Sequence, residues 1–207
     1  MQPPLAAFLE QVLATAQAGL TYSKDPFDIG RFQALREATV TLIASQSELD
    51  PRAIADWIAL DSGYPTPKLD VRALILNDAG QLLLVQECSD GCWTLPGGWC
   101  DIGDSPAAAV VREVVEETGL ECRAVRLLAL FDKHKHPHPP QLPHAHKAFF
   151  LCEVTGGQLL GETNETQGAG YFSLDALPAL SLHRVVDSQL RTLHAHVQQG
   201  RRETLFD

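Results

Sequence analysis

The sequence predicts an α/β protein in two parts: a small all-α domain over residues 1–66 and an α/β domain over residues 67–207. Residues 3–61 contain helical patterns and no clear strand pattern, whereas short apolar runs separated by turn signals follow residue 68. Between these regions, the segment SGYPTPK contains one Gly and two Pro, which break helical order. We therefore expect the domain boundary at this segment.

Three helices are expected in the first part. Residues 3–23 and 26–46 have the pattern of amphipathic helices, and Pro26 stands near the start of the second. The third is DPRAIADWIAL, with Asp50 as N-cap and Pro51 at the first helical position. A helical unit of this size buries little of its own surface, so we expect it to pack on the second part or on another chain.

The second part is expected to combine strands with two helices. LDVRALIL and QLLLVQE flank the turn NDAG and together predict a hairpin, and a short strand is expected around Trp93 to Leu95. A helix should begin at Pro106, capped by Ser105, and should end at Gly119. The further expected elements are the strands RAVRLLALF, KAFFLCEV and AGYFSL and a closing helix from Arg184 to about Gln198.

Composition excludes several classes of protein. The net charge of −10 disfavours a general nucleic-acid binder, so no DNA partner is expected. No apolar run is long enough to span a membrane, and MQPPLAAFLEQ lacks the basic region of a signal peptide. The five cysteines form an odd set without a CxxC pair, which fits a reducing, cytoplasmic environment.

The segment VVREVVEETGL, residues 110–120, concentrates acidic residues on one side of the expected helix. Helical residues are spaced about 100° apart around the axis, so Glu113, Glu116 and Glu117 share one face, and four valines occupy the other. Like charges at this spacing destabilise a helix. A cation, a partner chain or solvent must therefore offset the repulsion.

This segment belongs to a longer motif. GGWCDIGDSPAAAVVREVVEETGL resembles the Nudix box, G-x5-E-x7-R-E-U-x-E-E-x-G-U, in which U is an aliphatic residue. One position departs from the pattern, because Asp104 stands where the box has its first Glu. In the family that acid pairs with the box arginine, so Asp104 is expected to reach Arg112. The box positions that match are Gly98, Arg112, Glu113, Val114, Glu116, Glu117, Gly119 and Leu120.

The resemblance implies a Nudix fold, in which a mixed sheet lies between helices. It also implies an enzyme that hydrolyses the pyrophosphate of a nucleoside diphosphate linked to another moiety. The cofactor implied is Mg²⁺ or Mn²⁺, which oxygen ligands hold. The implied ligands are the carboxylates of Glu113, Glu116 and Glu117 and the carbonyl of Gly97, while Arg112 orients the carboxylates.

The general base in many relatives is a Glu on a loop after the box. GETNETQGAGYF offers Glu162 and Glu165, and we favour Glu165 because it stands nearer the short strand. The alternatives are that Glu165 is a solvated loop residue or that a box Glu serves as the base.

The resemblance extends to one bacterial branch of the family. GYPTPKLDVRALIL, LPGGWCDIG, DKHKHPH and ALPALSLHR are similar to CDP-choline pyrophosphatases, which carry a helical N-terminal extension and some of which accept ADP-ribose. The resemblance implies cleavage of CDP-choline to CMP and phosphocholine, and we expect a homodimer. The alternatives are an ADP-ribose or nucleotide-sugar pyrophosphatase and a non-catalytic nucleotide-binding sensor. The three Glu of REVVEE disfavour the sensor.

Four residues apart from the fixed positions of the box are candidates for contact with substrate. Arg72 is suited to a diphosphate, with a structural ion pair as the alternative. Trp99 can stack on a base or cover choline, with core packing as the alternative. Lys133 and His136 lie in KHKHPHPPQLPHAHK. That segment is either a loop that meets phosphate or the linked moiety, a transition-metal site, or a solvated Pro-rich connection.

Overall fold

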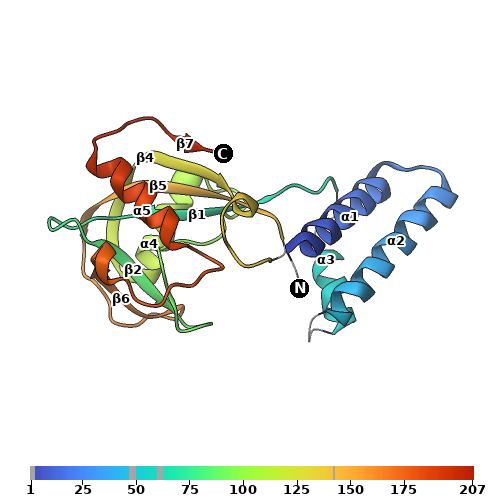
Figure 1. Ribbon diagram of the computed structural model, residues 1–207, viewed down its shortest axis with the longest axis horizontal. Coiled ribbons are helices and arrows are strands. Elements are labelled where there is room, and N and C mark those ends of the chain that lie inside the picture. Colours follow the sequence, from blue (N-terminus) through green and yellow to red (C-terminus); the bar gives the residue numbers. More distant parts are fainter. Residues whose placement is uncertain (1–2, 47–49, 60–62, 142) are drawn as a thin grey trace. The chain divides into compact units, whose positions relative to one another are not determined.

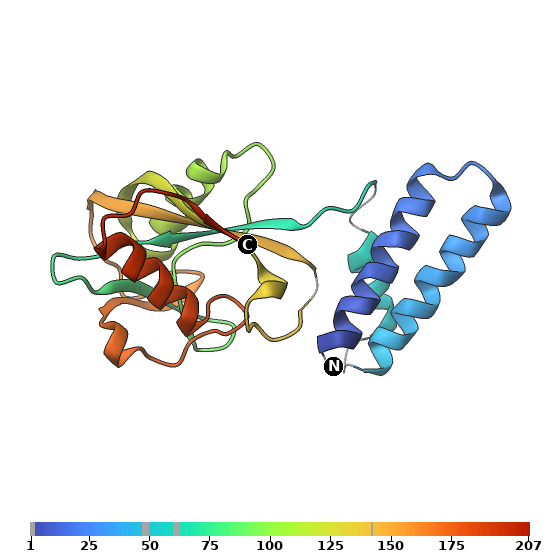
Figure 2. The ribbon, with the colours of Figure 1, turned by 45° about the horizontal axis from the view of Figure 1, so that its top comes forward.

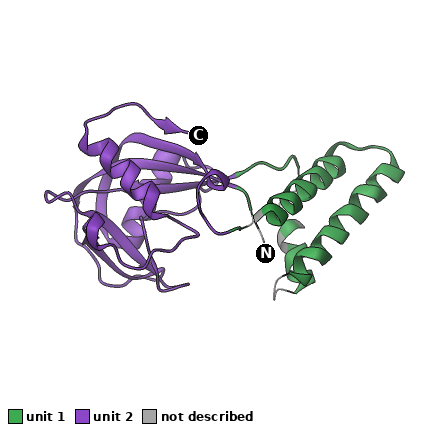
Figure 3. Ribbon diagram, in the orientation of Figure 1, with its two compact units in different colours: residues 1–67, 140–144 green, residues 68–139, 145–207 purple. Residues whose placement is uncertain are grey.

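The computed structural model describes residues 3–46, 50–59, 63–141 and 143–207. The described residues form two compact units, which are drawn in different colours in Figure 3. One unit comprises residues 1–67 with 140–144, and the other comprises residues 68–139 with 145–207.

The first unit is helical, as the sequence predicts (Figure 1). Its helices are α1 (Pro3–Tyr22), α2 (Pro26–Ser45) and α3 (Pro51–Ala59). Carboxylates begin two of them: Asp25 accepts the N–H groups of Phe27 and Asp28, and Asp50 accepts the N–H of Arg52 at 2.9 Å. Each cap satisfies donors that have no partner inside the helix.

The core of the helical unit is small. Leu9, Val40, Ile43 and Ile54 form its cluster of buried apolar residues, and Ala16 is also buried. Other large apolar side chains remain exposed, among them Phe8 and Phe27. Large exposed apolar side chains on a small unit are typical of a surface that another element or chain covers.

The second unit contains two sheets. One has the strand order β1-β5-β4-β7 and the other β3-β2-β6. β1 pairs with β5 in parallel, whereas β4 pairs with β5 antiparallel, so the larger sheet is mixed. The strands are β1 (Lys68–Leu74), β2 (Leu82–Glu87), β3 (Trp93–Thr94), β4 (Leu120–Asp132), β5 (Ala145–Gly157), β6 (Thr166–Phe172) and β7 (Leu205–Phe206). Short 3-10 helices cover Lys133–Lys135 and Leu174–Ala176.

The hairpin expected from these two segments forms only next to its turn, because β1 and β2 do not pair along their length. The turn is present, because Asn77 N–H donates to the Gln81 carbonyl at 3.1 Å and a single bridge joins Leu76 to Leu82. Beyond this bridge the strands enter different sheets, where β1 pairs with β5 and β2 with β6. A buried strand must satisfy its backbone groups within a sheet, and the partners here come from distant parts of the chain.

Two helices lie on opposite faces of the larger sheet, as Figure 1 and Figure 2 show. α4 (Pro106–Thr118) buries Ala109, Val110 and Val114 against one face, and α5 (Asp187–Gln198) buries Leu190 and Leu193 against the other. In β1, Val71 and Ala73 belong to the cluster with α4, and Leu74 belongs to the cluster with α5, as the strand period requires. The expected mixed sheet between helices is therefore confirmed. No described helix combines the length and the apolar character needed to cross a membrane.

Candidate active site

Helix α4 brings two carboxylates to a buried position. Glu113 and Glu117 are 7% and 4% exposed, one turn apart on the helix. Glu165, which directly precedes β6, completes a group in which one oxygen from each carboxylate lies within 4.8 Å of the others. Three carboxylates this close repel one another unless a cation lies between them or some are protonated.

Burial changes the acidity of both helix carboxylates. It raises the pKa of Glu117 to about 8, against the opposing effects of Arg72 and the Gly97 N–H. Burial also raises the pKa of Glu113. The Gly97 N–H donates to Glu117 Oε2 at 2.8 Å, which fixes the orientation of that carboxylate. The site is therefore built to receive positive charge.

Arg112 binds several acidic residues next to the carboxylate group. Its guanidinium donates to Glu113 at 3.1 Å and to Glu116 at 2.9 Å. It also reaches Asp104 at 3.2 Å, so the expected contact between Asp104 and the box arginine is present. Glu116 is exposed and lies outside the group that Glu113, Glu117 and Glu165 form.

The LPGG turn holds the carboxylates against β1. The Val71 N–H donates to the Gly98 carbonyl at 2.8 Å and the Ala73 N–H to the Pro96 carbonyl at 2.8 Å. Gly97 has φ +139°, and a Cβ there would lie 2.0 Å from the Val71 carbonyl oxygen. Glycine is therefore required at Gly97 for both its backbone conformation and its close approach to β1.

Glu165 reaches the group through a tight turn. Its N–H donates to the Thr163 hydroxyl at 3.2 Å, and the next residue, Thr166, donates its hydroxyl to the Glu117 carbonyl at 2.9 Å. This second contact ties the start of β6 to the end of α4. Glu162, the other candidate in this segment, is not part of the group.

Glu87 is an acidic residue near the site that the sequence analysis did not identify. It ends β2 opposite Thr166, and its charge contributes to the raised pKa of Glu117. Burial raises the pKa of Glu87 itself, and Arg184 Nε contacts its carboxylate at 2.7 Å. The relevant signal, the pairing of β2 with β6, connects residues far apart in the chain and does not appear in the local pattern.

Arg72 lies in a buried ion pair, the second of its two interpretations. It donates twice to Asp70 at 2.9 Å and once to the Leu95 carbonyl at 3.1 Å. Lys147 donates to the same carboxylate at 2.8 Å and is 1% exposed. Burial opposes ionisation of Asp70, but the two cations outweigh it and lower its pKa to about 2. Contact between Arg72 and substrate stays a prediction.

The other three residues predicted to contact substrate differ in their burial and in their neighbours. Trp99 is 47% exposed, whereas Trp93 packs on Phe172 with ring centroids 4.7 Å apart. Lys133 is buried in the 3-10 helix that follows β4. His136 contacts Asp207 at 3.2 Å and packs on Phe131. The structure does not bring these residues into the carboxylate group, and their contact with substrate stays a prediction.

Two protein-family models match the chain. A NUDIX domain matches residues 66–194. A UDP-X-like, N-terminal oligomerisation domain matches residues 3–58. The matches cover the region of the box and the region of the three N-terminal helices.

The chain is also similar to a curated protein and to solved structures. YjhB of Bacillus subtilis strain 168, provisionally named an ADP-ribose pyrophosphatase, is 45% identical over 199 residues, which cover 96% of this chain and 94% of YjhB. A solved ADP-ribose pyrophosphatase from Streptococcus suis 89-1591 is 44% identical with a TM-score of 0.62, covering 69% of this chain and 100% of that one. A solved UDP-X diphosphatase is 34% identical with a TM-score of 0.64, covering 100% of both chains.

Proposed function

Because the chain belongs to the Nudix family of hydrolases, we propose that it hydrolyses the pyrophosphate of CDP-choline, giving CMP and phosphocholine. The observation that carries the reaction type is the group of Glu113, Glu117 and Glu165 with oxygens within 4.8 Å of one another. The choice of CDP-choline is supported by the similarity of four segments along the chain to that branch of the family. Adenosine diphosphate ribose is the second candidate, since two relatives more than 40% identical are named as ADP-ribose pyrophosphatases.

Enzymes of this family generally depend on divalent cations. The donor set fits Mg²⁺ or Mn²⁺, because it consists of carboxylate oxygens and hard cations prefer oxygen. We assign Glu113 and Glu117 as ligands, with Glu116 and the carbonyl of Gly97 completing the set. When bound, the cation neutralises diphosphate charge and lowers the pKa of a bound water.

The residues of the chain have separate roles in this proposal. Glu165 accepts a proton from the attacking water, whose oxygen bonds to one phosphorus while the bridging oxygen leaves with the other half of the substrate. Arg112 holds the carboxylates of Glu113 and Glu116 in position through its hydrogen bonds to both. No covalent bond between enzyme and substrate is needed, and one water is consumed for each phosphoanhydride broken.

Four side chains are assigned to the substrate. Arg72 and Lys133 supply positive charge toward the diphosphate. Trp99 offers its exposed ring to the base or to choline. His136 meets the linked moiety.

The helical segment serves assembly in this proposal. The chain forms a homodimer through a domain that spans residues 1–66, and residues 67–207 form the catalytic domain. The match of residues 3–58 to an N-terminal oligomerisation domain supports this assignment, as do the exposed aromatic rings of Phe8 and Phe27. The described cysteines are all free, which supports a cytoplasmic location.

A turnover screen tests the proposal. The purified chain is incubated with Mg²⁺ and with CDP-choline, ADP-ribose, UDP-linked sugars, dinucleoside polyphosphates or nucleoside triphosphates, and products are separated by chromatography. We expect CDP-choline to give the highest kcat/KM. Brisk cleavage of ADP-ribose without cleavage of CDP-choline would favour the second candidate.

A further inference from the structure

Two threonine hydroxyls connect Glu165 to the end of α4. Thr163 Oγ1 accepts the N–H of Glu165 at 3.2 Å and the N–H of Thr166 at 3.1 Å. The Thr166 hydroxyl lies 3.0 Å from Thr163 Oγ1 and donates to the Glu117 carbonyl at 2.9 Å. The backbone of Glu165 is therefore joined, through two side chains, to the helix that carries Glu117.

The direction of each hydrogen bond in this chain of contacts follows from the protons available. A hydroxyl carries one proton and two acceptor lone pairs. Thr166 donates its proton to the Glu117 carbonyl, so towards Thr163 it can only accept. Thr163 therefore donates to Thr166, while its own oxygen accepts the two backbone N–H groups. Both hydroxyl protons are thereby placed, and the pair has a single hydrogen-bonding arrangement.

The Thr166 hydroxyl lies where a helix needs a donor. The last four carbonyls of an α-helix have no partner inside the helix. Helix α4 ends at Thr118, so the Glu117 carbonyl is one of these four. Because Thr166 is only 1% exposed, bulk solvent cannot take the place of its hydroxyl. The end of α4 therefore depends on this side chain for a hydrogen bond.

The backbone of Glu165 is held on both sides. Its N–H is bonded to the Thr163 hydroxyl, and its carbonyl accepts the N–H of Cys88, which directly follows β2, at 3.3 Å. The Thr163 N–H donates to the Thr166 carbonyl at 2.9 Å, which closes the turn around Glu165. The side chain of Glu165 is exposed. The turn thus fixes the backbone of Glu165 and leaves its carboxylate accessible to water.

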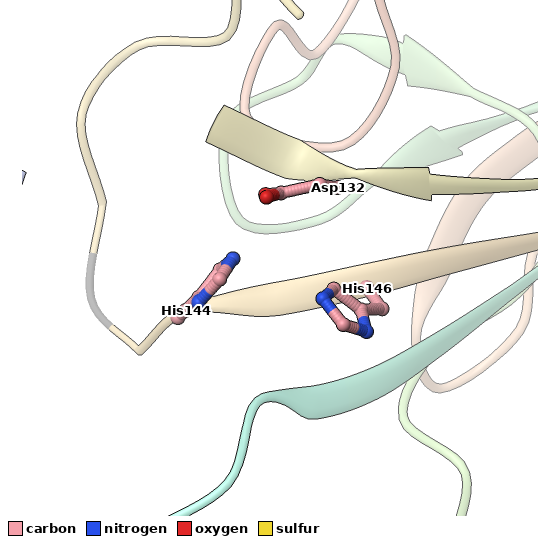
Figure 4. A group of neighbouring side chains, drawn as sticks. All are labelled: Asp132, His144 and His146. Atoms are coloured by element: carbon pink, nitrogen blue, oxygen red, sulfur yellow. The ribbon is translucent and has the colours of Figure 1, made fainter. Parts of the chain in front are cut away.

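A contact between a side-chain oxygen and the N–H two residues later is common by itself. Asp132, which Figure 4 shows at the end of β4, makes one with the His134 N–H at 2.9 Å. The contact of Thr163 has a further connection, because the same hydroxyl bonds to Thr166 and so reaches α4. This connection joins a loop residue to the helix that carries the other two carboxylates of the group.

We propose that Thr163 and Thr166 are positioning residues, which hold the Glu165 carboxylate in place against the carboxylates of α4 for the reaction. The inference rests on the proposed function, because it needs Glu165 as the proton acceptor. The threonines act through Glu165 and have no contact with substrate in this proposal. A misplacement of about 1 Å can cost about 100-fold in rate. Loss of either hydroxyl should therefore lower kcat and leave KM unchanged.

Steady-state kinetics of the full chain tests the proposal, at saturating Mg²⁺ and with the substrate that the wild type cleaves best. Valine has nearly the shape of threonine without the hydroxyl, whereas serine keeps the hydroxyl. We expect Thr166→Val to lower kcat about 10- to 100-fold with KM unchanged. Thr166→Ser should retain most of the wild-type kcat. Thr204→Val is the matched control, because the Thr204 hydroxyl also donates to a backbone carbonyl, that of Leu127 at 3.1 Å, and it should keep the wild-type kcat.

A double-mutant cycle assigns the effect to Glu165. Glu165→Gln removes the proton acceptor, so adding Thr166→Val to that variant should lower kcat no further. If Thr166→Val fails to fold, Thr163→Val takes its place in the cycle, since it keeps the bond between Thr166 and Glu117 and removes only the link to Glu165. A second full loss of kcat in the double variant would overturn the proposal.

Amide hydrogen exchange, followed by NMR, needs no turnover and so separates this inference from the proposed function. The Glu165 N–H should exchange at least about 10-fold faster in Thr166→Val than in the wild type. A wild type that cleaves no substrate would contradict the proposed function, and the exchange rates would then decide the positioning role alone. Equal exchange rates, a wild-type kcat in Thr166→Val, or an equal loss in Thr166→Ser would overturn the proposal.

Discussion

Glu117 combines a contact that orients its carboxylate with an environment that disfavours its charge. The Gly97 N–H fixes one oxygen at 2.8 Å, while burial raises the pKa to about 8. A carboxylate in this setting stabilises a nearby cation more than an exposed one does, because solvent screens the charge less.

Glu117→Gln is expected to lower kcat at least about 100-fold, since loss of outer partners of a metal site alone costs 10- to 100-fold. The variant should melt no lower than the wild type without metal, because glutamine keeps an acceptor for the Gly97 N–H and removes a charge that burial disfavours. Steady-state kinetics at saturating Mg²⁺ and thermal melting measure both effects. Glu116→Gln is the comparison variant, because Glu116 is an assigned ligand that is exposed and lies outside the buried group, and its loss should be smaller. Equal losses in the two variants would contradict the special role of Glu117.

Asp70→Asn is expected to destabilise the fold by about 3–5 kcal/mol, because Arg72 and Lys147 would remain buried without their shared counterion. The pH dependence follows from the pKa of Asp70, which is lowered to about 2. The carboxylate stabilises the folded state above its ordinary pKa of about 4, and this stabilisation is lost as pH falls toward 2. Denaturant unfolding between pH 6 and 2 measures both effects. Wild-type and variant proteins with the same stability at pH 6 would contradict this prediction.

The element that positions the site is the LPGG turn between β3 and α4. Its backbone pairs with β1, and its Gly97 presents an N–H to α4. A side chain at Gly97 would meet the backbone of β1, which cannot move without disturbing the sheet. The turn therefore transmits the position of β1 to the carboxylates of α4.

Gly97→Ala is expected to lower both stability and kcat. Its φ of +139° is strained for alanine, and its Cβ would lie 2.0 Å from the Val71 carbonyl oxygen. Gly91→Ala is the matched control, because Gly91 also has positive φ but has no atom within 4 Å of its Cβ position. The control should lose only about 1–2 kcal/mol. Denaturant unfolding compares the two variants, and an equal loss would refute the steric argument.

Local signals in the sequence predicted the elements better than their pairing. Ser105, Pro106 and Gly119 mark the ends of α4, and the structure has a helix between those caps. The parallel pairing of β1 with β5 joins Asp70 to Lys147, and no local pattern encodes a contact across such a separation. Glu87 was missed for the same reason: it lies near the site because β2 pairs with β6, and this pairing is not visible in the local sequence. Glu113 and Glu117 were predictable because one helix carries both.

At the scale of the whole molecule, the chain joins a catalytic fold to a helical segment that matches an oligomerisation domain. The core of the helical segment contains few buried side chains, and several of its aromatic rings are exposed. Two-fold dimers are the commonest soluble oligomers, so we expect a second copy of the chain to cover those rings.

Deletion of residues 1–66 is expected to weaken dimerisation and to raise KM together. The reason for the coupled effect is that a dimer can bring the helices of one chain to the substrate of the other. Light scattering measures the mass of the truncated protein, and steady-state kinetics measures KM. A truncated protein that stays dimeric with an unchanged KM would mean that the helices are an independent appendage.

The most direct test of the proposed activity is product analysis after incubation of CDP-choline with the wild-type chain and Mg²⁺. Chromatography and phosphorus NMR identify the products, and Glu117→Gln serves as the control for contaminating enzymes. The proposal predicts equal amounts of CMP and phosphocholine from the wild type, with at least about 100-fold less from the variant. No cleavage by the wild type, or equal cleavage by both proteins, would contradict it.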